Sequence, residues 1–107
     1  MRRGDLITVV IAGDYGKPRP ALVMQADVFE ALGSVTIAPL TSTLYDAPLI
    51  RISVEPSAAN GLRATSQVMT DKLMTVPRNR AGAVFGRLEL GAIAQVELAL
   101  ARFLGLG

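Results

Sequence analysis

The chain contains no cysteine and no histidine among its 107 residues. Without cysteine it has no disulfide, no thiolate nucleophile and no cysteine-based zinc site. Without histidine it lacks the base of most catalytic triads, and carboxylates are its only strong metal ligands. Its Asp and Glu residues are scattered, without the spacing of a calcium-binding loop. We therefore expect neither a metal nor another cofactor.

Long hydrophobic runs are also absent, and none approaches the roughly 18 residues that a membrane-spanning helix needs. The apolar stretch 6–11 is too short for the core of a signal peptide. The length suits a single domain over residues 1–107. We expect a soluble, cytoplasmic protein with no membrane partner. Its net charge of +2 permits a nucleic-acid or acidic-peptide partner without arguing for one.

What the chain does contain is a series of short apolar and β-branched segments, separated by glycine, proline and asparagine. These segments predict six or seven strands, at 6–11, 21–25, 35–38, 49–54, 64–70, 72–76 and 83–88. Pro39 is expected to end the third strand. Asp27 is expected to cap a brief helix over 27–32, and Asn60-Gly61 to form a tight turn.

Residues 89–104 have the one clear helical pattern, and Gly105 follows them as a stop. Glu89 is expected in the first turn, near the positive end of the helix dipole. The apolar residues share a broad face, formed by Leu90, Ile93, Val96, Leu100, Phe103 and Leu104. We expect this helix to pack on the sheet and to contact another chain. The whole pattern predicts a mainly β fold with a C-terminal α-helix, as a small bent antiparallel sheet or partly open SH3-like barrel.

The segment 17–25 places Arg19 between two prolines, immediately before an apolar strand. Each proline fixes φ at about −65°, so the guanidinium projects from a stiff backbone. A planar cation with five donors at this point suits the binding of a phosphate or a carboxylate. From this segment alone, an ordinary surface arginine at a strand entry remains an open interpretation.

A cluster of three hydroxyls, on Thr41, Ser42 and Thr43, follows the third predicted strand. Hydroxyls at strand ends commonly satisfy backbone groups. Ligand binding and backbone bonding are equally open roles for these side chains.

Five short motifs occur in a recognisable order. They are Arg3-Gly4-Asp5-Leu6, Arg19-Pro20-Ala21-Leu22-Val23, Ala38-Pro39-Leu40-Thr41-Ser42, Gly61-Leu62 followed by Ser66-Gln67-Val68 and Asp71, and Gly86-Arg87-Leu88. In this order they resemble the MazF/PemK/Kid toxins of bacterial type II toxin–antitoxin modules, over nearly the whole chain. The resemblance implies a homodimeric, metal-independent endoribonuclease that cuts single-stranded RNA, usually messenger RNA. It also implies that a cognate antitoxin stops the toxin by occupying its groove.

The resemblance implies catalytic roles for Arg19 of the Arg-Pro motif and Thr41 of the Pro-x-Thr motif. In the implied reaction the 2′-hydroxyl of the RNA attacks the adjacent phosphorus and leaves a 2′,3′-cyclic phosphate. The protein then needs only to orient the RNA and to stabilise charge on the phosphorane. Because arginine keeps its proton near neutral pH, Arg19 suits a clamp on the non-bridging oxygens better than a general acid. Thr41 would give a hydrogen bond to the same phosphate.

Asp71 is the best remaining candidate for a base towards the 2′-hydroxyl, although a surface carboxylate at a strand corner is an equally open interpretation. Lys17 and Lys72 are candidates for contacts with flanking phosphates, or are solvated side chains. Pro20 and Ser42 complete the predicted RNA-binding set. The antitoxin is expected to present an acidic, disordered segment that folds on binding and covers the arginine of the Arg-Pro motif.

Two alternatives remain open. Met69 and Met74 stand where relatives often carry arginine, so cleavage could be slow, altered or absent, and the chain could be an inactive relative that only binds antitoxin. The segment 69–77 also resembles the CcdB toxins, which share the fold and poison DNA gyrase without catalysis. The Arg19-Pro20 motif and the sequence of residues 103–107 depart from the CcdB pattern. The ribonuclease hypothesis is therefore favoured.

Overall fold

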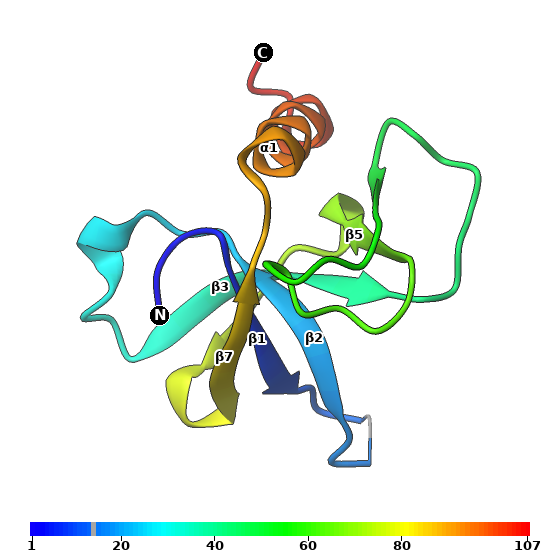
Figure 1. Cartoon of the computed structure of the whole chain (residues 1–107). Helices are drawn as coiled ribbons and strands as arrows, with labels where there is room; N and C mark the ends of the chain where they lie inside the picture. Colours follow the sequence, from blue (N-terminus) through cyan, green and yellow to red (C-terminus); the bar gives the residue numbers. More distant parts are fainter. Residues whose placement is uncertain (14) are drawn as a thin grey trace.

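The computed structural model describes residues 1–13 and 15–107, and their strands form one antiparallel sheet (Figure 1). The strands are β1 (Asp5–Val10), β2 (Pro18–Val23), β3 (Ser34–Thr41), β4 (Arg51–Val54), β5 (Ser66–Met69), β6 (Met74–Pro77) and β7 (Ala81–Arg87). Three short 3₁₀ helices lie between them, η1 (Asp27–Phe29), η2 (Thr70–Lys72) and η3 (Arg78–Arg80), and α1 (Leu90–Leu104) follows β7. In the described part of the chain, no helix is long and apolar enough to span a bilayer.

Strand β3 is the centre of the sheet, because three other strands pair with it. Its first half pairs with β6 and its end with β5, while β2 pairs with its middle. The strands run in the order β4-β5-β3-β2-β1-β7, with β6 beside β3. Pro39 lies inside β3, so the expectation that it ends this strand was wrong. Along one edge of β3, pairing with β6 stops at Ile37 and pairing with β5 begins at Leu40. Pro39, which has no N–H to donate, lies in the gap between these two pairings.

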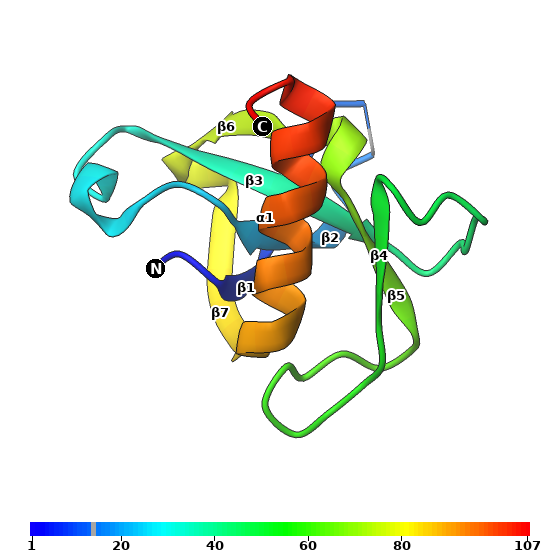
Figure 2. The same ribbon diagram turned by 90° about the horizontal axis from the view of Figure 1, so that it is seen from above.

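The sheet buries both of its faces. One core lies between the sheet and α1, which crosses one face (Figure 2), and it includes Leu6, Leu22 and Val96. A second core includes Ile7 and Val35. Because successive side chains of a strand point to opposite faces, a strand that is buried on both sides is apolar without alternation. The predicted mainly β fold with a C-terminal helix is confirmed, as an open antiparallel sheet with β4 and β7 at its ends.

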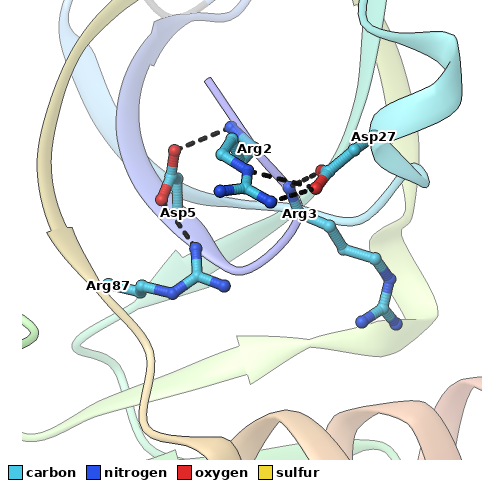
Figure 3. A network of polar contacts seen from close by, with 5 residues as sticks. All are labelled: Arg2, Arg3, Asp5, Asp27 and Arg87. Atoms are coloured by element: carbon cyan, nitrogen blue, oxygen red, sulfur yellow. Dashed lines mark hydrogen bonds and ion pairs between the residues drawn. The ribbon is translucent and has the colours of Figure 1, made fainter.

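The brief helix after β2 differs from its prediction in length and in its cap. It is confined to η1, and its N-cap is Ala26, without a side-chain hydrogen bond. The Asp27 carboxylate instead accepts hydrogen bonds from the backbone N–H of Arg3 (2.7 Å) and from the guanidinium of Arg2 (3.1 and 3.2 Å; Figure 3). The Arg3 bond is the main cause that lowers the pKa of Asp27. This carboxylate therefore joins the start of the chain to η1.

The loop between β4 and β5 is fixed by the fully buried side chain of Asn60. Its amide nitrogen donates to the Glu55 carbonyl and the Glu89 carboxylate, and its amide oxygen accepts from the backbone N–H groups of Ser57 and Leu62. The side chain thereby uses both its donors and its acceptor. Glu89 is the N-cap of α1 rather than part of its first turn, which corrects the prediction, and its carboxylate holds this loop.

Strand β7 approaches this loop so closely that one position accepts only glycine. A Cβ added to Gly86 would fall on the backbone carbonyl of Asn60, which cannot rotate away as a flexible side chain could. The neighbouring Gly61 has a φ of 67°, and a Cβ added there would lie 2.7 Å from the carbonyl oxygen of Phe85. The loop and β7 therefore pack backbone against backbone.

We expect Gly86→Ala to lower the free energy of unfolding by about 1–3 kcal/mol, the usual effect of overpacking, because backbone must shift to admit the methyl group. Gly91→Ala is a matched control, since no atom lies within 4 Å of a Cβ added there. In the first turns of α1 it should leave stability unchanged or raise it by up to about 1 kcal/mol. Urea unfolding of the three proteins measures both effects. Equal midpoints for Gly86→Ala and the parent chain would contradict the close contact.

Candidate active site

A groove of about 630 Å³ lies beside the ends of β2 and β3. It is lined by Thr8, residues 18–20, residues 40–43, residues 61–64, Ser66 and Phe85. Among the described residues that line it there are two arginines and no acidic side chain. Elsewhere in the described chain, no three carboxylates gather in a way that could hold a metal ion. The groove therefore offers positive charge, hydroxyls and apolar surface to a ligand.

The pairing of β2 with β3 brings Arg19 and Thr41 to the same groove. The two strands are in register at Ala21 and Pro39, and the same antiparallel register continued by two residues sets Arg19 across from Thr41. Residues directly opposite each other on paired strands project from the same face. Both side chains line the groove and also a smaller adjoining cavity of about 220 Å³. The two residues assigned to catalysis by the resemblance therefore lie together.

Arg19 belongs to a strand and not to a strand entry. The second strand begins at Pro18, three residues earlier than predicted, and Arg19 pairs with Val9 of β1 on its other side. Pro18 and Pro20 also pair with β1, at Val10 and Thr8. The backbone of this segment is thus held both by the proline rings and by the neighbouring strands, which limits the positions that the guanidinium can reach.

The hydroxyl of Thr41 satisfies a backbone group and still keeps its proton. Its Oγ1 accepts a hydrogen bond from the backbone N–H of Thr43 at 3.1 Å. Because a hydroxyl has one proton and two lone pairs, this contact leaves the proton to be donated. Ser42 and Thr43 are exposed and line the same groove. One contact can therefore orient Thr41 without preventing it from binding an anion.

Gln67 fixes the loop that follows Thr41. It pairs with Thr41 in the ladder and its side chain is almost fully buried. Its Nε2 donates to the carbonyl of Tyr45 at 2.9 Å, and its Oε1 accepts from the N–H of Tyr45 at 3.0 Å. Gln67 belongs to one of the sequence motifs, but no role for it was predicted. A glutamine inside a predicted strand was the only signal, and it does not indicate which loop the amide will bind.

Asp71 is not among the residues that line the groove. Its carboxylate accepts hydrogen bonds from Nε (2.9 Å) and Nη2 (3.3 Å) of Arg51, and both side chains are nearly buried. The hydrogen bond from Arg51 is the main cause that lowers the pKa of Asp71. The Arg51 guanidinium also lies 5.4 Å from the centre of the Tyr45 ring. A carboxylate already bonded to a guanidinium, with a lowered pKa, is a weak proton acceptor.

The other selected residues divide into two groups. Pro20 and Ser42 line the groove. Lys17 and Lys72 are exposed and do not line it, and Nζ of Lys72 lies 3.6 Å from Oδ2 of Asp71. The structure therefore does not bring the two lysines to the Arg19 groove.

Arg63 and Phe85 line the groove, although neither was predicted as a site residue from the sequence. Arg63 was a basic residue after a predicted turn, a pattern typical of solvated loops. Phe85 was an aromatic residue in a predicted strand, a pattern typical of a core. Only the contact between β7 and the loop after β4 brings them to one wall.

The comparisons with known proteins agree with this architecture. Residues 2–104 match the model of a protein family described as the PemK-like, MazF-like toxin of type II toxin-antitoxin systems. The chain is 47% identical over 107 residues to the probable endoribonuclease MazF of Mycolicibacterium smegmatis, and this alignment covers 99% of this chain and 98% of that protein. It is also similar to the solved structure of the Mycobacterium tuberculosis toxin MazF-mt6, at 26% identity and a TM-score of 0.83, over 96% of this chain and 98% of that one. A MazE-MazF crystal structure from Deinococcus radiodurans matches at 25% identity and a TM-score of 0.78, over 100% of this chain and 97% of that one.

These matches decide between the two hypotheses that share one fold. The family model covers almost the whole chain, and it describes MazF-like toxins rather than CcdB-like gyrase poisons. The motifs that suggested the resemblance lie within the matched residues, from Arg3 to Leu88. The chain therefore belongs to the PemK-like, MazF-like family of toxins of type II toxin–antitoxin systems.

Proposed function

We propose that this toxin is a metal-independent endoribonuclease of single-stranded messenger RNA, formed as one domain over residues 1–107. The observation that carries the proposal is that Arg19 and Thr41 line the same groove, whose described lining has no acidic residue. A relative named as a probable endoribonuclease, at 47% identity, supports it. The positive charge of this groove suits a polyanion such as RNA better than a single acidic side chain.

In the proposed reaction the 2′-hydroxyl oxygen of the RNA attacks the adjacent phosphorus as it loses its proton. The bond from phosphorus to the 5′-oxygen breaks, and that oxygen gains a proton. The products end in a 2′,3′-cyclic phosphate and a 5′-hydroxyl. Arg19 binds the non-bridging oxygens, where negative charge increases in the transition state. The hydroxyl of Thr41 donates a hydrogen bond to the same phosphate.

The chemistry suits a chain without histidine because the nucleophile belongs to the substrate. The protein contributes orientation and electrostatic stabilisation, which can supply a large part of a rate enhancement. The register of β2 and β3 provides that orientation, since it holds both side chains on one face of a sheet.

We expect Arg19→Ala to lower the single-turnover rate of RNA cleavage by about 10²–10³-fold, the usual effect of removing one electrostatic donor from a transition state. Arg19→Lys should restore little activity, because an ammonium cannot reproduce a bidentate guanidinium contact. The assay contains EDTA, and the product ends are identified by their chemistry. Arg80→Ala, an exposed arginine of η3 outside the groove, is the matched control and should cut RNA at the parent rate.

Two results would overturn this proposal. Purified protein that cuts no RNA would support an inactive relative that only binds antitoxin. Cleavage that is equally fast in Arg19→Ala would show that the charge of Arg19 has no part in the reaction.

We further propose that Asp71 is a positioning residue and not the base. Its carboxylate holds Arg51, and Arg51 in turn lies over Tyr45, whose backbone is bound by Gln67. Asp71, through Arg51, and Gln67 thereby both support the loop that follows Thr41. The general base that accepts the proton of the 2′-hydroxyl is then a group other than Asp71.

Asp71→Asn should lower stability at neutral pH, by about 1–3 kcal/mol for a hydrogen bond to a charged group. Because the folded-state pKa of Asp71 lies below its ordinary value of 3.8, the ion pair stabilises the fold fully above that value and loses its effect as pH falls through the folded-state pKa. The difference between the parent chain and Asp71→Asn should therefore close in strong acid. Urea unfolding across this pH range measures it.

The cleavage rate separates the two roles of Asp71. Loss of a general base typically lowers a rate by about 10²–10⁴-fold and changes its pH profile. We expect Asp71→Asn to lower the rate of RNA cleavage by less than about tenfold and to leave the pH profile of that rate unchanged. A larger loss with an altered profile would restore Asp71 as the base.

The proposed partners are a second copy of the chain and a cognate antitoxin. Helix α1 leaves large apolar side chains exposed, among them Leu90 (79% exposed) and Leu98 (54%), which a second copy could cover. The MazE-MazF structure of the Deinococcus relative supports an antitoxin partner. The arginines and hydroxyls of the groove suit an acidic segment that folds on binding and covers Arg19.

We expect sedimentation at micromolar concentration to give the mass of two 11.3 kDa chains. Leu98→Glu, which places a charge on the exposed face of α1, should shift this equilibrium towards the single chain. A peptide with the acidic segment of the antitoxin should displace RNA from the groove. A single-chain mass at this concentration would contradict the dimer, and a neutralising antitoxin that leaves RNA bound would contradict occupation of the groove.

A further inference from the structure

One wall of the groove has no part in the reaction proposed above. It is formed by Gly61, Leu62 and Arg63 of the loop before β5 and by Phe85 of β7. We call these four residues the Phe85 wall. Phe85 is the one aromatic side chain among the described residues that line the groove, and it is 37% exposed. An exposed aromatic ring in a polyanion-binding groove is a candidate for direct contact with substrate.

We propose that the Phe85 wall is a nucleobase subsite, in which the Phe85 ring stacks on one base of the single-stranded RNA and Arg63 binds a flanking phosphate. This inference rests on the proposed ribonuclease function and identifies how the same groove holds its substrate beyond the reacting phosphate.

The Phe85 ring lies beside the backbone of the loop before β5. Gly61 has a φ of 67°, and a Cβ added to it would lie 3.2 Å from Cδ1 of the ring. The next residue of β7 is Gly86, whose backbone packs against the carbonyl of Asn60. The backbone of Phe85 and Gly86 thus packs against this loop, while 37% of Phe85 remains exposed. An aromatic side chain, with only two χ angles, loses little conformational entropy when it binds a second flat group.

Stacking on aromatic side chains is a common way in which proteins bind single-stranded RNA. Each stacked base contributes about 1–3 kcal/mol and tolerates different sequences, because every base has a π face. Leu40 and Leu62 add apolar surface to the groove, and Thr8, Thr41 and Ser66 add hydroxyls. The groove volume of about 630 Å³ is within the range of sites that enclose a small molecule, and it exceeds what one phosphate requires.

Arg63 supplies a second cation to the groove, from a different element than Arg19. In the described part of the chain no carboxylate forms an ion pair with Arg63, in contrast to Arg51, which Asp71 neutralises. An arginine without a carboxylate partner in the described chain adds to the positive potential of the groove. The combination of an aromatic ring and a flanking arginine favours a nucleotide over an apolar peptide side chain, which needs no charge beside it.

The first experiment measures binding without cleavage. The parent protein is used to map its cleavage site in RNA, and a fluorescent oligonucleotide with that site and a 2′-deoxy sugar at the attacking position is then made as the probe. We expect Phe85→Leu to raise its Kd by about 10–100-fold, and Phe85→Tyr to bind nearly as the parent does, because it keeps the ring. Phe29→Leu is the matched control, since Phe29 is also exposed (52%) but lies outside the groove. It should not change the Kd.

A double-mutant cycle identifies the base that stacks. Abasic nucleotides are placed one at a time around the cleavage site, and each probe is measured with the parent and with Phe85→Leu. At one position the abasic change should weaken binding to the parent by about tenfold or more and have little further effect in Phe85→Leu. Arg63→Gln should lower the salt dependence of binding by about 0.7 in log–log slope, the value for one phosphate of a single strand, whereas Phe85→Leu should leave the slope unchanged.

The outcomes separate this inference from the proposed function. If the parent cuts RNA and requires Arg19, but Phe85→Leu binds every probe as the parent does, the subsite is wrong and the ribonuclease stands. If Phe85→Leu weakens only the antitoxin peptide, the Phe85 wall is a peptide site and the inference is again wrong. A parent protein that neither binds nor cuts RNA would refute both. Phe85→Tyr keeps the aromatic ring at the same position and so tests the ring itself, and urea unfolding of Phe85→Leu distinguishes loss of the ring from loss of folding.

Discussion

The groove depends first on the antiparallel register between β2 and β3. This register, continued past its last pair at Ala21 and Pro39, brings Arg19 and Thr41 to one groove, and Arg19 also pairs with Val9 of β1. Because side chains alternate between faces, a slip of one residue would turn Arg19 and Thr41 to opposite sides of the sheet. The same slip would move Leu22 and Val23 between the two cores. Burial on both faces therefore specifies the register, and the register brings the cation and the hydroxyl together.

The remaining walls of the groove depend on buried polar side chains that bind loops. Asn60 binds three backbone groups of the loop after β4 and the carboxylate of Glu89 at the start of α1, and Gln67 holds Tyr45 by its N–H and its carbonyl. The ion pair of Arg51 with Asp71 lies beside the same tyrosine. These contacts replace the strand pairing that a loop lacks, so that irregular backbone has satisfied hydrogen bonds. The sheet thus supplies Arg19 and Thr41, and buried polar side chains shape the loops around them.

A chain with neither histidine nor cysteine restricts the chemistry that this groove can perform. Arg19 and Thr41 can stabilise charge and orient a phosphate, and the nucleophile in our proposal comes from the RNA. Such a mechanism requires the substrate to be held on both sides of the reacting phosphorus. The exposed Phe85 ring and the arginine beside it provide a physical means of holding the strand that needs no titratable group.

Local pattern in the sequence determined the strands and the C-terminal helix, because β-branched runs and the helical period are encoded by neighbouring residues, and the order of short motifs selected Arg19 and Thr41 as candidates. It could not show that Pro39 lies inside a strand, since that depends on where β3 changes partners from β6 to β5. The sequence alone could not show that Arg51 binds the Asp71 carboxylate. Nor could it show that Phe85 is partly exposed and lines the groove beside the loop of Gly61. These decisions belong to the tertiary structure, because each depends on a contact between segments that are distant in the chain.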